Sequence, residues 1–309
     1  MIDPFQFAGW VSDAAKAASG AAATEPAAPT DLASLRKHYD AFNRRLLGTA
    51  LDLYPVELAE QEIGGVPVNI VTPVGGPRDP RVLICLHGGA FMWGSGAGAL
   101  LEAVPIAATS GMQVMAIDYR LAPEHAFPAA VEDVLAVYAA LLTRHAASSV
   151  GIYGCSAGGA LSAQVTARLV LDGAPIPGAI AMLHGTGLDF AGDSASTAAA
   201  FDPREAQGAV PSIESLPCFA GTDPRDPLVL PGNHPAVLEQ FPPSLLVSAT
   251  RDFAASACSV MHRRLLAAGV EAQFVLFDGL WHAHHMAANL PEARETFGLL
   301  STFFKAHLK

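Results

Sequence analysis

The chain has 309 residues, of which 51% are hydrophobic, so it is long enough for one large domain or two smaller ones and too apolar for a disordered protein. Its formal net charge is −11, whereas a nucleic-acid binder needs clustered Lys and Arg to meet phosphates. The composition therefore argues against a nucleic-acid partner.

The cysteines and the N-terminal residues indicate the cellular compartment of the protein. Cys85, Cys155, Cys218 and Cys258 lie far apart and form no Cys-x-x-Cys pair, so reduced thiols are expected rather than a disulfide framework or a zinc site. The chain begins MIDPFQFAGW, without the basic region of a secretory signal. No apolar stretch is long enough to span a bilayer. These features predict a cytoplasmic protein.

Residues 1–55 differ in composition from the rest and are expected to form an N-terminal cap segment. Within them, 18–30 is rich in Ala, Pro and Thr and predicts a flexible connector. Asp31 is a good N-cap for the helix that follows. Four apolar residues recur there at helical spacing: Leu35, Tyr39, Phe42 and Leu46. The apolar face of this helix is expected to pack on the main domain, and the alternative is a lid over an active site.

Residues 56–309 alternate between short apolar runs and helical segments, and are expected to form the main domain. The predicted strands cover 81–86, 113–117, 150–153, 178–183, 245–249 and 273–277. The predicted helices cover 128–145, 159–172, 255–268 and 291–308. Apolar runs without alternation are typical of parallel strands covered on both faces. The order of elements predicts a doubly wound α/β sheet.

Residues 186–226 interrupt the alternation of predicted strands and helices. They belong to a long stretch rich in Pro, Gly, Ser and Asp that separates two of the predicted strands. Loops of that length in a compact domain are usually functional. We expect this segment to be a cap or lid insertion.

The predicted strand 81–86 runs directly into a glycine pair, Gly88 and Gly89. Glycines just after a strand allow backbone N–H groups to point at a substrate oxygen, as an oxyanion hole requires. His87 is expected to anchor this loop, since it precedes the nucleophile strand described next. The alternative is a plain glycine turn.

The run from Gly154 to Gly158 joins a predicted strand to a predicted helix and fits the pattern G-x-S-x-G around Ser156. A nucleophile on such a sharp turn projects its hydroxyl freely, and the turn tolerates only small neighbours. The N–H of Ala157, at the start of the helix, would complete the oxyanion hole. Ser156 is therefore the expected nucleophile, and the alternative is a glycine-rich turn without chemistry.

Together with DYRLAPEH at 118–125, Asp133 and DPRDPL at 223–228, these motifs make the chain resemble hormone-sensitive-lipase-like α/β-hydrolases, also called family IV bacterial esterases. The resemblance covers about residues 57–309. Two departures are Ala90, where the family often has a third glycine, and Cys155, where Asp or Thr is common. The resemblance implies the α/β-hydrolase fold, with a mostly parallel central sheet, flanking helices and a helical cap. It makes 56–309 the catalytic domain.

In this fold the triad follows the order Ser, acid, His. Asp252 comes just after the predicted strand 245–249, and His282 follows the strand 273–277 after a glycine step like that of the family. Asp252 would orient His282, which would take the proton of Ser156. The competing acids are Asp226 and Asp278.

His284 and His285 compete with His282 within the sequence WHAHH. The cluster could suggest a metal, but no carboxylate or cysteine stands at ligand spacing to complete a site. Solvated loop histidines are the expectation here, with no metal and no cofactor.

The expected activity is that of a serine carboxylesterase that forms an acyl-enzyme. The resemblance implies short- to medium-chain acyl esters, a small-molecule substrate and a possible homodimer. Phe91, Met92 and Trp93 would line the substrate pocket or, equally, pack against the cap. The alternatives are a lactone hydrolase or deacetylase, an amidase or arylformamidase, and a non-catalytic receptor.

Overall fold

The computed structural model describes residues 6–22, 28–201 and 212–309. An eight-stranded sheet forms the centre of the molecule, with the strand order β1-β2-β4-β3-β5-β6-β7-β8. The strands are β1 (Val56–Ile63), β2 (Val66–Pro73), β3 (Val82–Leu86), β4 (Gln113–Ile117), β5 (Val150–Cys155), β6 (Ala179–Leu183), β7 (Ser244–Ala249) and β8 (Ala272–Phe277). From β4 through β8 all neighbours are parallel, and β2 pairs antiparallel with both β1 and β4. The α/β-hydrolase fold is confirmed, and so are the six predicted strands.

The hairpin of β1 and β2 was not predicted. Its two-residue loop is Gly64-Gly65, with φ values of 62° and 81°, the conformation that hairpin loops favour and that glycine adopts at little cost. Most of β1 is exposed, since it lies at the sheet edge. A Gly-Gly pair between two alternating runs was the available signal.

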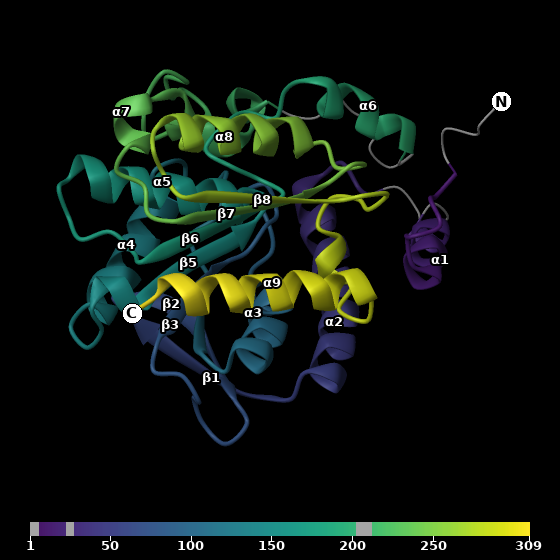
Figure 1. The fold of residues 1–309 in the computed structure, drawn as a ribbon, viewed down its shortest axis with the longest axis horizontal. Helices are drawn as coiled ribbons and strands as arrows, with labels where there is room; N and C mark the ends of the chain where they lie inside the picture. The colour runs from purple at the N-terminus through teal and green to yellow at the C-terminus, as the bar shows by residue number, and fades with distance from the viewer. Residues whose placement is uncertain (1–5, 23–27, 202–211) are drawn as a thin grey trace.

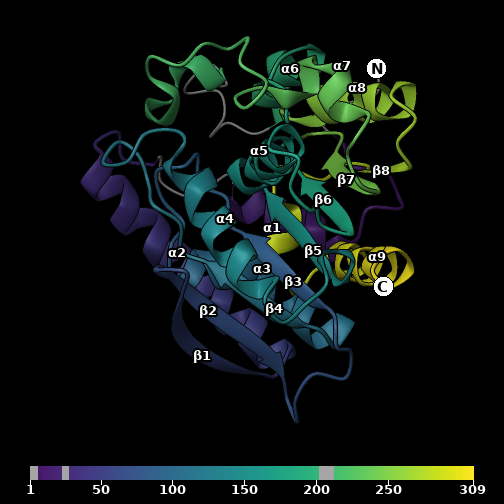
Figure 2. The ribbon, with the colours of Figure 1, turned by 90° about the vertical axis from the view of Figure 1, so that its left-hand side faces the viewer.

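Helices cover both faces of the sheet, as Figures 1 and 2 show. One face packs against α3 (Ala97–Ser110) and α9 (Pro291–His307), and the other against α4 (Ala129–Leu141), α5 (Ala157–Leu171) and α8 (Ala255–Ala267). β3, β5, β6 and β7 are buried along their whole length. This burial explains why those strands are apolar without alternation.

Helix α3 was also missed by the sequence analysis. Eleven of its fourteen residues are buried, and Pro105 lies within it. A helix that is apolar all round gives no 3.6-residue periodicity, and an internal proline argues against a helix. Its position over the sheet supplies the burial that overrides both signals.

The N-terminal segment contains α1 (Asp13–Ala22) and α2 (Leu32–Leu53). The expected connector at 18–30 is wrong for 18–22, which form the last part of α1; residues 23–27 lie outside the described part. Asp31 caps α2 as predicted, because its side chain accepts a hydrogen bond from Ser34 N at 2.9 Å. The arm packs on the main domain, α2 against α3, and Ser12 donates to Glu292 at the start of α9.

The segment 186–226 holds α6 (Asp193–Phe201) and two short 3₁₀ helices, η3 (Ile213–Ser215) and η4 (Pro217–Phe219), while 202–211 lie outside the described residues. The remaining short elements are η1 (Ala147–Ser149), η5 (Pro231–Asn233), α7 (Pro235–Leu238) and η6 (His284–Met286). None of the described helices is both long and apolar enough to cross a membrane.

Candidate active site

The turn from β5 to α5 holds Ser156 in a strained conformation, with φ 57° and ψ −118°. A Cβ on Gly154 would lie 2.3 Å from the Leu86 carbonyl oxygen, and one on Gly158 only 1.8 Å from it. The turn therefore needs glycine at both positions. Ser156 N donates to the carbonyl of Leu183 at the end of β6, at 2.7 Å, which fixes the turn at the carboxyl edge of the sheet.

Asp252 and His282 meet at the same edge, after β7 and β8. His282 Nδ1 donates to Asp252 Oδ1 at 2.7 Å, and the same oxygen accepts from Ala254 N at 2.9 Å. The His282 ring stacks on Phe253, with centroids 4.1 Å apart. The acid and the histidine expected from the sequence are thus brought together, with the imidazole held from two sides.

Asp252 is fully buried yet ionised. Burial raises the pKa of its carboxyl, but His282 and His184, through charge and hydrogen bonds, together hold that pKa far below its usual value. A buried carboxylate needs such partners, because an unpaired charge in the interior is costly.

His184 is a residue that the sequence analysis missed. It follows β6 directly with φ 53°, is fully buried, and donates from Nδ1 to Asp252 Oδ2 at 2.7 Å. Ser248 donates to the same oxygen. Burial lowers the pKa of His184 to about 4, although Asp252 opposes the shift. A histidine at the carboxyl end of a core strand was the available signal.

The expectation that His284 and His285 are solvated is wrong, since both are fully buried. They lie in η6, whose backbone enters from Ala283 at φ 58° and turns both rings into the interior. His285 Nε2 donates to the buried Glu102 of α3 at 2.8 Å. The two rings therefore belong to a buried polar cluster.

The expected oxyanion residues lie around Ser156. A Cβ on Gly88 would stand 3.1 Å from the Cys155 carbonyl oxygen and 3.4 Å from Ser156 Cβ, so the loop passes directly over the nucleophile turn. Gly89 has φ 111°, and a Cβ there would clash with Trp93. Ala157 begins α5, so its N–H is among the four that have no intrahelical acceptor.

His87 and Tyr119 brace this loop. Their rings stack with centroids 4.1 Å apart, and the Tyr119 hydroxyl donates to the His87 carbonyl at 2.7 Å. His87 Nδ1 donates to the Gly88 carbonyl, also at 2.7 Å. His87 is buried and engaged within the loop, in agreement with the anchoring role expected for it.

The three residues expected near the substrate have different surroundings. Phe91 is buried and packs edge-on against Phe219 at 5.2 Å between centroids. Met92 is partly buried beside the same core. Trp93 stacks on Tyr39 of α2 with centroids 4.7 Å apart. The packing alternative thus describes Phe91, whose partner Phe219 belongs to the 186–226 segment, and Trp93, which joins the loop to the N-terminal arm.

Arg36 of α2 fixes the arm to the same loop. Its guanidinium donates to the Met92 carbonyl at 2.8 Å, to the Ala122 carbonyl at 2.9 Å and to both oxygens of Glu124 at 2.7 Å. This ion pair lowers the pKa of Glu124 to about 2. The DYRLAPE segment is therefore a bridge between α2 and the oxyanion loop.

The competing acids lie elsewhere. Asp278 accepts from Trp10 Nε1 at 2.8 Å and from Thr250 at 3.1 Å, and Asp226 accepts from Leu228 N at 2.8 Å within its own turn. The hydrogen bonds described for these two carboxylates are structural ones. The carboxylate that contacts His282 is that of Asp252.

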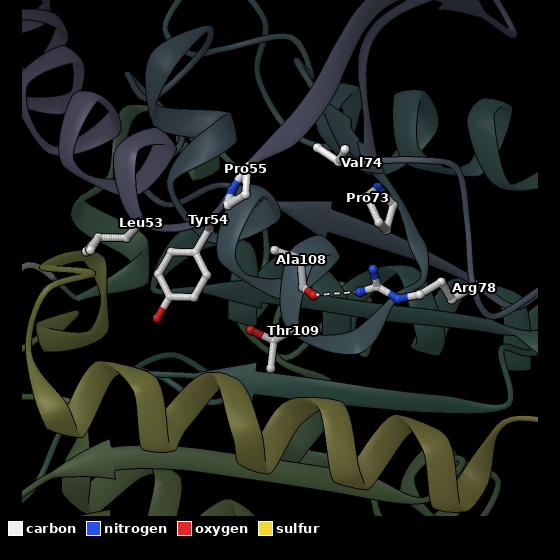
Figure 3. A pocket seen from close by; sticks show the side chains of 8 residues that line it. All are labelled: Leu53, Tyr54, Pro55, Pro73, Val74, Arg78, Ala108 and Thr109. Carbon is white, nitrogen blue, oxygen red and sulfur yellow. Dashed lines mark hydrogen bonds between the residues drawn. The ribbon is translucent and has the colours of Figure 1, made fainter.

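A cavity of about 350 Å³ lies at the opposite edge of the sheet, as Figure 3 shows. It lies between the ends of α2, β2 and α3, and Arg78 donates to the Ala108 carbonyl beside it at 3.1 Å. Its lining is Leu53, Tyr54, Pro55, Pro73, Val74, Arg78, Ala108 and Thr109. None of these residues belongs to the turn that carries Ser156, so this cavity is separate from the candidate site.

Known proteins share this architecture. Residues 83–286 match the family described as the α/β-hydrolase fold. The chain is 33% identical over 266 residues to LipR of Mycobacterium tuberculosis, assigned as an acetyl-hydrolase, and the match covers 80% of this chain and 79% of that protein. The crystal structure of esterase E25 superposes with a TM-score of 0.84 at 27% identity, covering 100% of this chain and 99% of that one. An esterase of the bacterial hormone-sensitive lipase family gives a TM-score of 0.80 at 28% identity, covering 96% and 98%.

Proposed function

The chain belongs to the hormone-sensitive-lipase-like group of the α/β-hydrolase family and is a serine carboxylesterase, and from this premise we propose Ser156, Asp252 and His282 as its catalytic triad. The observation that supports the triad best is the hydrogen bond from His282 Nδ1 to the buried Asp252, beside the strained nucleophile turn. Strained backbone of this kind clusters at functional sites.

In the proposed reaction, Ser156 Oγ attacks the ester carbonyl while His282 Nε2 takes its proton. Asp252 holds the Nδ1–H tautomer and stabilises the imidazolium that forms. The alcohol leaves after His282 returns the proton to its oxygen, and the acyl group stays on Ser156. Water activated by His282 then releases the acid and restores the serine.

We propose the N–H groups of Gly88, Gly89 and Ala157 as the oxyanion hole. The close passage of the loop over the nucleophile turn supports this role for the two glycines, and the first turn of α5 supports it for Ala157. Loss of one such donor typically costs about 3 kcal/mol in transition-state stabilisation.

We propose short acyl esters, acetate esters above all, as substrates. The assignment of LipR as an acetyl-hydrolase supports this choice.

We further propose that residues 1–55 and 186–226 act as a cap around the site. Arg36 and Trp93 join the first segment to the oxyanion loop, and Ser194 of the second donates to the Phe253 carbonyl beside His282. The cytoplasm is the proposed location, because all four cysteines are buried and free. A homodimer stays a prediction.

The triad is tested by labelling with a fluorophosphonate, followed by peptide mapping. The expected result is one probe per chain on Ser156, and no labelling of Ser156→Ala. An adduct on another serine, or an unreactive wild-type protein, would contradict the proposed nucleophile.

A further inference from the structure

Three imidazole rings meet behind the proposed catalytic acid. His184 comes from the end of β6, while His284 and His285 come from η6, and all three are fully buried. The ring centroids lie 5.2 Å apart for His184 and His284, 5.3 Å for His184 and His285, and 5.8 Å for His284 and His285. One potential ligand atom from each ring lies within 4.8 Å of those of the other two.

Each ring has one nitrogen with no hydrogen-bond partner among the described residues: His184 Nε2, His284 Nδ1 and His285 Nδ1. Buried polar atoms are almost always paired, so an unpartnered one needs an explanation. Three of them in one cluster indicate a common partner.

The remaining nitrogens set the protonation of the rings. His184 Nδ1 donates to Asp252 and His285 Nε2 donates to Glu102. In a neutral imidazole, the nitrogen opposite a donating one carries a lone pair. His184 Nε2 and His285 Nδ1 are therefore acceptors.

The same reasoning applies to His284. The Thr296 hydroxyl donates its proton to the Glu292 carbonyl at 2.9 Å, so its oxygen is left to accept from His284 Nε2 at 3.5 Å. The Trp281 carbonyl also lies beside the His284 ring, so either tautomer of His284 finds an acceptor. With its proton on Nε2, His284 adds a third lone pair to those of His184 and His285. One cation can bind all three lone pairs, whereas a water molecule can donate only two hydrogen bonds.

We propose that His184, His284 and His285 form a buried zinc site. Three imidazoles on a tetrahedral zinc, with Zn–N distances of about 2.0–2.1 Å, place their ring centroids about 5 Å apart, close to the separations seen here. Histidine ligands of zinc generally donate their other N–H to a carboxylate, as His184 and His285 do. Glu102 and Cys155 lie near His285, with ligand atoms within 4.8 Å of one another.

The proposed site differs from the expectation of no metal, which was argued from the spacing of residues along the chain. The missing ligand is His184, which lies 100 residues before His284 along the chain. Spacing within WHAHH cannot reveal it, because β6 brings it into place. The proposal does not depend on the ester chemistry, since its readouts are metal content and metal affinity.

The test uses the full-length protein, stripped with a chelator and titrated with Zn²⁺ by calorimetry, with Co²⁺ as the spectroscopic probe. We expect one Zn²⁺ per chain, a higher melting temperature when loaded, and a four-coordinate Co²⁺ absorption band. His284→Gln and His285→Gln should abolish the stoichiometric site. Glu102→Gln should weaken binding by about 10–100-fold.

Two further variants keep the result interpretable. His284→Cys retains a zinc ligand and should bind Co²⁺ with a new thiolate charge-transfer band, which a merely structural role of His284 would not produce. His234→Gln, at a partly buried histidine outside the cluster, should bind as the wild type does. Absence of saturable binding near one equivalent, or binding unchanged in His284→Gln and His285→Gln, overturns the proposal.

Discussion

At the scale of single residues, Asp252 connects the chemistry of this protein to its interior. One carboxylate oxygen accepts hydrogen bonds from His282 and from Ala254 N. The other accepts hydrogen bonds from His184 and Ser248. A carboxylate with all these donors is fixed in place. The orientation of the proposed general base is therefore set by groups that never touch the substrate.

The variant Asp252→Asn tests this arrangement. The amide cannot hold the Nδ1–H tautomer of His282 and at the same time accept from His184, so kcat for p-nitrophenyl acetate should fall by roughly 10⁴-fold. Asp226→Asn and Asp278→Asn are the matched controls and should stay within a few-fold of wild type. If kcat fell sharply in Asp278→Asn while Asp252→Asn stayed active, Asp278 and not Asp252 would be the acid of the triad.

The sequence identified the triad candidates because each stands beside a local signal, either G-x-S-x-G or the end of an apolar strand. It did not identify His184, and it placed His284 and His285 in solvent. The environment of those rings depends on contacts between β6, α3 and η6, which are distant along the chain. Trp93 illustrates the same limit, since its partner Tyr39 lies on α2.

At the scale of elements, α2 is held against the glycine loop by one arginine. Arg36→Ala removes donors to two backbone carbonyls and to Glu124. Because the pair is partly exposed, we expect a loss of about 1–2 kcal/mol in unfolding free energy. The Km for short esters should rise as the loop loosens.

Arg44→Ala is the control on the same helix. Arg44 pairs only with Asp40 at the surface among the interactions described for it, so its loss should change the unfolding free energy by less than about 0.5 kcal/mol. Urea titrations measure both variants. Equal effects of the two substitutions would mean that Arg36 does not anchor the arm.

At this scale, helices and strands could be predicted from the sequence where their burial leaves a periodic or continuous apolar pattern. The central strands and α4, α5, α8 and α9 were expected within a few residues of their observed bounds. The hairpin of β1 and β2 was missed because β1 is a largely polar edge strand, and α3 because burial on nearly all sides removes helical periodicity. Burial set by the tertiary fold decided both cases.

At the scale of the whole molecule, the buried histidines make stability depend on pH. The pKa of His184 is about 4 in the folded metal-free protein and near 6.5 when unfolded. Between these values the unfolded chain binds a proton that the folded chain does not, so stability is full above pH 6.5 and falls as the pH drops towards 4. The loss is on the order of 3 kcal/mol.

Urea unfolding of the chelator-treated protein at pH 7, 6 and 5 measures this loss. The lowered pKa of His284 acts in the same direction, whereas Asp252 contributes only at lower pH, since its own pKa is depressed. A free energy of unfolding that stays constant from pH 7 to pH 5 would contradict the burial of neutral rings.

If Ser156 is the nucleophile of this α/β-hydrolase, ester cleavage requires its hydroxyl. The most direct measurement is the turnover of p-nitrophenyl acetate and butyrate by wild-type protein and by Ser156→Ala, with circular dichroism to verify that both are folded. We expect kcat to fall on the order of 10⁶-fold in the folded variant. Turnover by Ser156→Ala within tenfold of wild type would contradict this expectation.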